Sequence, residues 1–242
     1  FNSAWDPIVI EGCADSALNL LRRTTDCEIE LNFTISRKGL EALREGKCEL
    51  AGFNFPKSST NNSKAFGTFG HLLTKNNGLI FFATRLQGLA VAPGNPKKIY
   101  SILDIASRKA KFINRREGTG TRILFDQMLD VLAVKPEEIE GYNDISDTQF
   151  FTAVQIASGK VDVGLCTANV AKENGLDFIP LAKEVYYLAA DEKFLETAKA
   201  KKFIQFLRSY DWAEFKDQLE GYDFTGTGEV FKVSDVFTAD AS

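Results

Sequence analysis

The order of short apolar strands and amphipathic helices constrains this chain more than any other feature of its sequence. Strands are predicted at residues 8–10, 28–33 and 48–53, and the helices between them begin near Asp15 and Ser36, which we expect to act as N-caps. A β-α-β-α-β order implies parallel strands joined by right-handed crossovers. We therefore expect an α/β fold.

The middle of the chain repeats the same order. Strands are predicted at residues 111–114 and 161–165, and helices at residues 122–132 and 149–158. Two similar units indicate two lobes, each with a mostly parallel sheet flanked by helices.

The chain is predicted to cross twice from lobe to lobe, near residues 84–87 and 183–187. Lobe one then comprises residues 1–85 plus 187–242, and lobe two comprises residues 86–186. The remaining predicted elements include strands at 79–83 and 88–92 and helices at 194–209 and 212–219.

Composition excludes several classes of partner. The net charge of −4 argues against a nucleic-acid-binding surface, which is normally basic. No apolar run approaches the roughly 20 residues that a membrane span needs. We expect neither nucleic acid nor a membrane span in this chain.

Few residues suit catalysis or metal binding. The only histidine, His71, cannot form a multi-histidine metal site, and a Ser-His-Asp arrangement would depend on it alone. None of the four cysteines is spaced as C-x-x-C, although disulfides stay open. We expect no metal, no cofactor and no catalytic residue.

A glycine-rich turn at residues 114–122 (NRREGTGTR) is the most specific local signal. A strand ends here and a helix begins, and the free N–H groups and partial positive charge of a helix N-terminus attract small anions. The alternative is a plain helix cap with solvated arginines. The predicted ligand contacts in this turn are Arg115, Gly118, Thr119, Gly120, Thr121 and Arg122.

Lobe one has a turn of the same strand–turn–helix form at residues 12–16 (GCADS). Ligands of open α/β sheets bind outside the carboxyl ends of strands, which places this turn and the ends of two further strands at the ligand. A purely capping role for Asp15 or Ser16 stays open. The predicted contacts at these positions are Gly12, Cys13, Asp15, Ser16, Phe53, Asn54 and Cys166.

Cys13 and Cys166 would then both face the ligand. This arrangement permits recognition of a thiol or a soft metal centre, but a free cysteine more often packs as a small hydrophobe. A hydrolase or transferase that uses either thiol is a less favoured alternative.

Residues 87–96 (QGLAVAPGNP) and 112–122 (FINRREGTGTR) resemble the periplasmic-binding-protein-like domain related to molybdate- and tungstate-binding proteins. Residues 157–165 (ASGKVDVGL) and 221–229 (GYDFTGTGE) continue the resemblance. The resemblance implies a type II periplasmic-binding fold that holds a ligand between two hinged lobes. The chain departs from the family pattern at Cys13, where that family commonly has Ser, at Arg116, usually Gln, and at Thr119, usually Ser.

We therefore expect a solute-binding protein, not an enzyme, that holds a small anion between its lobes. The ligand would be an oxyanion such as molybdate or tungstate, or a small carboxylate. The resemblance implies an exported, periplasmic protein that serves an ABC transporter permease. The alternative is the effector-binding domain of a cytoplasmic regulator, similar to the substrate-binding domain of LysR-type proteins.

Overall fold

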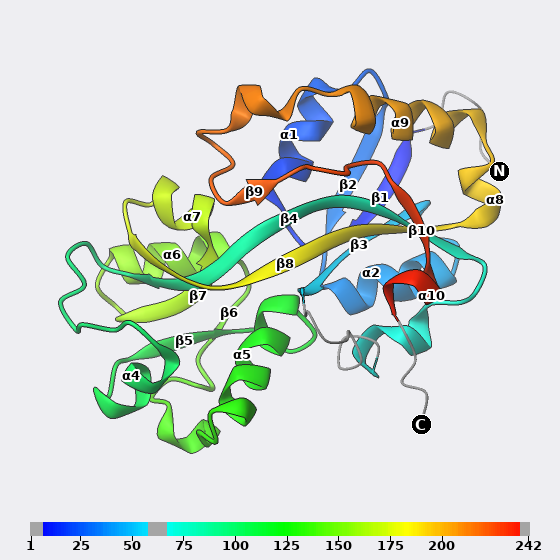
Figure 1. Cartoon of the computed structure of the whole chain (residues 1–242). Helices are drawn as coiled ribbons and strands as arrows, with labels where there is room; N and C mark the ends of the chain where they lie inside the picture. Colours follow the sequence, from blue (N-terminus) through cyan, green and yellow to red (C-terminus); the bar gives the residue numbers. More distant parts are fainter. Residues whose placement is uncertain (1–6, 58–66, 238–242) are drawn as a thin grey trace. The chain divides into compact units, whose positions relative to one another are not determined.

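The computed structural model describes residues 7–57 and 67–237 and divides into two compact units (Figure 1). Unit 1 consists of Phe1–Thr84, Val185–Glu214 and Asp223–Ser242, and unit 2 of Arg85–Glu184 and Phe215–Tyr222. The short segment 215–222 thus groups with unit 2, although the chain on both sides of it belongs to unit 1.

Unit 1 begins with β1 (Ile8–Gly12), α1 (Ser16–Thr24), β2 (Ile29–Phe33), α2 (Ser36–Arg44) and β3 (Leu50–Pro56). β1 lies between β2 and β3 and is parallel to both. The chain moves from β1 outward to β2 and then back across β1 to β3. Right-handed crossovers therefore place α1 and α2 on opposite faces of these strands.

Unit 2 follows the same path with β5 (Phe112–Arg115), α5 (Gly120–Val131), β6 (Ile145–Ser146), α6 (Gln149–Ala157) and β7 (Val163–Thr167). Here β5 lies between β6 and β7 and is parallel to both. The repeated β-α-β-α-β order predicted from the sequence is confirmed. It makes α1 and α2 of unit 1 equivalent to α5 and α6 of unit 2.

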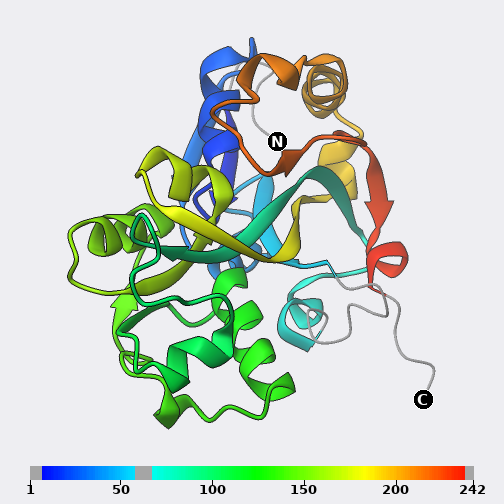
Figure 2. The ribbon, with the colours of Figure 1, turned by 60° about the vertical axis from the view of Figure 1, so that its left-hand side comes forward.

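Two strands of 15 residues each, β4 (Asn77–Val91) and β8 (Asp177–Asp191), pass from one unit into the other. They are neighbours in the sheet and run side by side in both views (Figures 1 and 2). β4 pairs with β7 in the antiparallel sense. The prediction of separate strands at 79–83 and 88–92 was wrong, because β4 is continuous through Arg85 and Gln87.

The C-terminal helices also differ from the prediction. A short α8 (Glu192–Leu195) precedes α9 (Ala198–Ser209), because Thr197 caps α9 and interrupts the predicted helix. The predicted helix at 212–219 is reduced to a 3-10 turn, η3 (Trp212–Phe215). Within the described residues, no helix is both long and apolar enough to cross a membrane. The remaining elements are α4 (Ile102–Ser107), α7 (Ala168–Glu173), α10 (Val233–Val236), β9 (Tyr222–Asp223), β10 (Val230–Lys232), η1 (Gly70–Leu72) and η2 (Pro136–Glu138).

Candidate functional site

The glycine-rich turn connects β5 to the amino end of α5 within unit 2. Gly118 has a φ of +82°, a left-handed conformation that favours glycine. Thr119 is the N-cap, and its hydroxyl accepts from the N–H of Arg122 at 3.3 Å and donates to the carbonyl of Arg116 at 2.8 Å. The first N–H groups of a helix have no intrahelical acceptor. The backbone N–H groups of Gly120 and Thr121 therefore have no acceptor within α5, and they follow the turn that leads from β5.

The three arginines of this turn occupy different environments. Arg115, the last residue of β5, is 8% exposed. Arg116 is exposed and forms an ion pair with Asp147. The guanidinium of Arg122 lies 2.8 Å from Asp126 and 4.5 Å from the ring centre of Tyr142, and it donates to the carbonyl of Arg115.

Asp126 therefore holds Arg122 against its own helix, with 11% of its side chain exposed, whereas Arg115 is buried at the end of β5. The predicted ligand contacts of Arg115 and Arg122 both stay predictions.

A network of amides and hydroxyls lies beside the first turn of α5. The hydroxyl of Thr121 accepts from Nε2 of Gln87 at 2.5 Å and from Nε2 of Gln149 at 3.5 Å. Oε1 of Gln149 accepts from the backbone N–H of Thr167 at 2.7 Å. These four residues come from β4, α5, α6 and β7, so the network ties together the strand ends of unit 2.

Unit 1 has a corresponding cluster at the carboxyl ends of β1 and β3. The hydroxyl of Ser36 lies 3.1 Å from Sγ of Cys13 and accepts from the backbone N–H of Asn54 at 3.5 Å. Asn54 is 1% exposed, and among the described residues neither side-chain atom, Nδ2 or Oδ1, has a hydrogen-bond partner.

Ser36 does not cap α2, so that prediction was wrong. The N-cap is Ile35, which has no side-chain capping bond, and Ser36 is the first helical residue. Its hydroxyl instead turns toward the strand ends, where it meets Cys13 and Asn54.

The other predicted contacts of unit 1 have roles in holding the fold. Asp15 caps α1 by accepting from the N–H of Leu18 at 3.0 Å, and Ser16 is the first helical residue. A Cβ on Gly12 would lie 2.2 Å from the carbonyl oxygen of Gly52, so β1 and β3 approach too closely for a side chain. Phe53 is fully buried and packs its ring against other aromatic rings of unit 1. Their contacts with a ligand stay predictions.

The cysteines are all free thiols. Cys166 on β7 is fully buried, and this burial raises the pKa of its thiol to about 12 although the nearby Arg115 acts in the opposite direction. A thiol with so high a pKa is a poor nucleophile at neutral pH.

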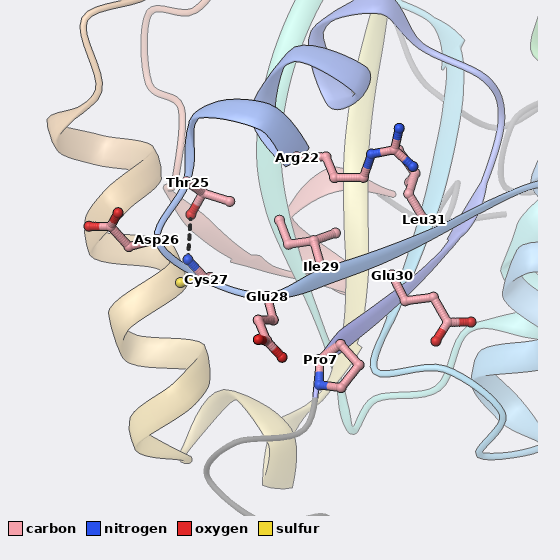
Figure 3. A pocket seen from close by; sticks show the side chains of 9 residues that line it. All are labelled: Pro7, Arg22, Thr25, Asp26, Cys27, Glu28, Ile29, Glu30 and Leu31. Atoms are coloured by element: carbon pink, nitrogen blue, oxygen red, sulfur yellow. Dashed lines mark hydrogen bonds between the residues drawn. The ribbon is translucent and has the colours of Figure 1, made fainter.

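A pocket of about 630 Å³ in unit 1 has the wrong position and charge for an anion (Figure 3). Its lining runs from Pro7 through the segment that leads into β2, at the amino ends of β1 and β2. The acidic side chains of Asp26, Glu28 and Glu30 outnumber the single Arg22. We assign no ligand to it.

His71 lies exposed in η1. Over residues 7–57 and 67–237, no group of three or more His, Cys, Asp or Glu side chains is arranged to hold a metal ion.

Sequence reasoning missed Ser36, Gln87 and Gln149 as site residues. Ser36 and Gln149 are equivalent, because each is the first residue of the second helix in its unit. The repeat could have identified this pair. Gln87 could have been found as the one amide in the apolar run at residues 86–91.

Comparison with known proteins is consistent with this geometry. Residues 18–208 match the family model described as the PBP superfamily domain. The uncharacterized protein YvgK of Bacillus subtilis is 33% identical over 195 residues, which cover 81% of this chain but only 63% of that protein.

Solved structures share the fold at low sequence identity. A phosphate-bound putative phosphate ABC transporter substrate-binding protein from Clostridium perfringens superposes with a TM-score of 0.62 at 18% identity, covering 94% of this chain and 100% of that one. The effector-binding domain of QuiR in complex with shikimate gives 0.58 at 14% identity, covering 83% and 94%. This chain belongs to the PBP superfamily domain family and has the type II periplasmic-binding fold.

Proposed function

We propose that this chain is a solute-binding module, without catalytic activity, that takes a small anion at the amino end of α5. The proposal is carried by two features of one turn: the buried side chain of Arg115, the last residue of β5, and the amino end of α5, a 12-residue helix that begins five residues later. A buried cation and a helix N-terminus at one strand end both favour negative charge.

The chemistry of the strand ends suits an oxygen-rich ligand. The turn between β5 and α5 supplies hydrogen-bond donors, namely the backbone N–H groups of Gly120 and Thr121 and the guanidinium of Arg115. An oxyanion such as molybdate or tungstate, or a small carboxylate, presents several acceptors to such a set. The sequence-based expectation that Cys13 and Asn54 of unit 1 contact the same ligand stays a prediction.

The role of the module is proposed from its relatives. The phosphate-bound neighbour is a transporter substrate-binding protein, which supports an exported, periplasmic protein that delivers its anion to an ABC transporter permease. The second candidate is the effector domain of a regulator, which the QuiR domain supports. A helix-turn-helix or a signal peptide upstream of Phe1 in the gene would separate these candidates.

Isothermal titration calorimetry tests the proposal with molybdate, tungstate, sulfate, phosphate and shikimate as probes. We expect the native protein to bind at least one of them, and Arg115→Ala to weaken that binding by about 1.5–3 kcal/mol, the worth of a charge-assisted hydrogen bond. Arg115→Lys, which keeps the charge but not the guanidinium geometry, should weaken it less.

Arg108→Ala is the matched control, because Arg108 is a partly exposed arginine paired with Asp104 at the end of α4 in the same unit. The Arg108→Ala variant should bind the anion with the same affinity as the native protein. Thermal unfolding without ligand establishes that each variant is folded. An unchanged affinity in folded Arg115→Ala, or no binding of any probe to the native protein, would contradict the proposal.

A further inference from the structure

The hydroxyl of Thr121 is held by two amides from different elements. Nε2 of Gln87 on β4 and Nε2 of Gln149 on α6 both donate to its oxygen, at 2.5 and 3.5 Å. Thr121 is 3% exposed and Gln87 is fully buried, so bulk water does not compete for these bonds. Thr121 is the second residue of α5, next to the first-turn donors.

The orientation of the Gln149 amide follows from its second bond. Oε1 accepts from the backbone N–H of Thr167 at 2.7 Å, and a backbone N–H can only donate. Nε2 of Gln149 must therefore face Thr121. This contact makes Gln149 a donor to the hydroxyl and never an acceptor from it.

The backbone of Gln87 pairs with that of Thr167 in the β4–β7 ladder, which fixes the main chain at this position. Its Nε2 donates to Thr121, and its Oε1 is buried without a hydrogen-bond partner among the described residues. The hydrogen bond to the Thr121 hydroxyl therefore holds the side-chain amide of Gln87 in place.

A threonine hydroxyl has two lone pairs and one proton. When both lone pairs accept from amide N–H groups, the remaining proton has to be donated to a third group. We propose that Gln87 and Gln149 are positioning residues that hold the Thr121 hydroxyl as a hydrogen-bond donor to the bound anion. This inference rests on the proposed function. It adds to that function a neutral hydrogen-bond donor, the Thr121 hydroxyl, and the two amides that orient it.

A double-mutant cycle tests the inference, with the anion that the native protein binds most tightly among molybdate, tungstate, sulfate, phosphate and shikimate as the calorimetric probe. Thr121→Val should reduce affinity about 10- to 100-fold, as loss of a hydrogen bond to a charged group does. Gln87→Leu should reduce it about tenfold, because the hydroxyl is then free to rotate away. The double variant should bind like Thr121→Val alone, within about twofold.

Two further variants separate positioning from mere packing. Thr121→Ser keeps the hydroxyl, so it should bind within a few-fold of the native protein and keep its sensitivity to Gln87→Leu. Gln87→Glu places a carboxylate that accepts the Thr121 proton, so it should bind more weakly than Gln87→Leu. Thermal unfolding without anion shows whether each variant is folded.

The outcomes are distinguishable from those for the proposed function. If the affinity losses caused by Gln87→Leu and Thr121→Val multiply in the double variant, the positioning role is overturned while anion binding stands. The same holds if Gln87→Glu binds the anion as tightly as the native protein does. If the native protein binds none of the anions, both the inference and the proposed function are overturned.

Discussion

Several polar side chains near the strand ends are buried, and their burial costs folding free energy. Arg115, Gln87 and Asn54 are each at most 8% exposed. A buried polar atom without a partner costs about 1–3 kcal/mol of folding free energy. Asn54 therefore lowers stability at a strand end where an apolar side chain would pack more favourably, which is typical of a position that serves binding.

The thiol of Cys166 gives a direct test of residue environment. Its burial raises the pKa to about 12, so at pH 8 only about one thiol in ten thousand is ionised and open to alkylation. We expect iodoacetamide to label the half-buried Cys27 of the native protein but not Cys166, as measured by mass spectrometry of peptides.

Unfolding in urea should expose all four thiols and give labelling at each, which serves as the control. Rapid labelling of Cys166 in the native protein would contradict the buried environment. It would also revive the alternative of a cysteine-dependent enzyme.

At the scale of elements, caps decide where helices begin. The Thr119 and Thr197 hydroxyls cap helices of the same length, α5 in unit 2 and α9 in unit 1. Thr119→Ala and Thr197→Ala should each lower the free energy of unfolding by about 1 kcal/mol, measured by urea denaturation. Only Thr119→Ala should also weaken anion binding, because only α5 belongs to the proposed site. Equal affinity losses in both variants would contradict that assignment.

Element order was predictable from the sequence because apolar periodicity and turn residues are local signals. The α5 turn was found in this way, since the Gly and Thr residues that form it are adjacent in the chain. Continuity of β4 was not predictable, because Arg85 and Gln87 look like the end of an apolar run. Their partners, Glu184 and Thr121, are distant in sequence, and only the fold brings them together.

The role of Ser36 was hidden for a related reason. A serine at the start of a helix usually caps it, and the local sequence contains no sign that Ile35 takes the N-cap position instead. The contact with Cys13, 23 residues earlier, appears only when β1 and α2 pack together.

At the scale of the whole molecule, one chain path is used twice and two long strands connect the copies. The strand ends of each copy gather polar side chains at equivalent places: Ser36 with Asn54 in unit 1, and Gln149 with Thr167 in unit 2. Because these ends are set by topology, a similar cluster arises in both units from different residues. The connecting strands β4 and β8 belong to both units, so their pairing affects the stability of the entire chain.

A buried ion pair joins those two strands where they enter unit 2. Nε of Arg85 lies 3.1 Å from Oε2 of Glu184, and the two side chains are 2% and 0% exposed. Arg85→Met leaves the Glu184 carboxylate buried without its guanidinium. We expect this variant to lose about 3–5 kcal/mol of unfolding free energy, measured by urea denaturation.

The double variant Arg85→Met, Glu184→Leu is the informative control. It removes both charges and supplies apolar volume, so it should recover most of the stability that the single variant loses, since a buried ion pair is often no better than well-packed hydrophobic residues. Removal of the exposed pair Lys172–Glu220 of unit 2 should cost at most about 1 kcal/mol. If Arg85→Met were as mild as that change, the ion pair would contribute little, and the backbone hydrogen bonds between β4 and β8 and the packing of their apolar residues would hold the strands together.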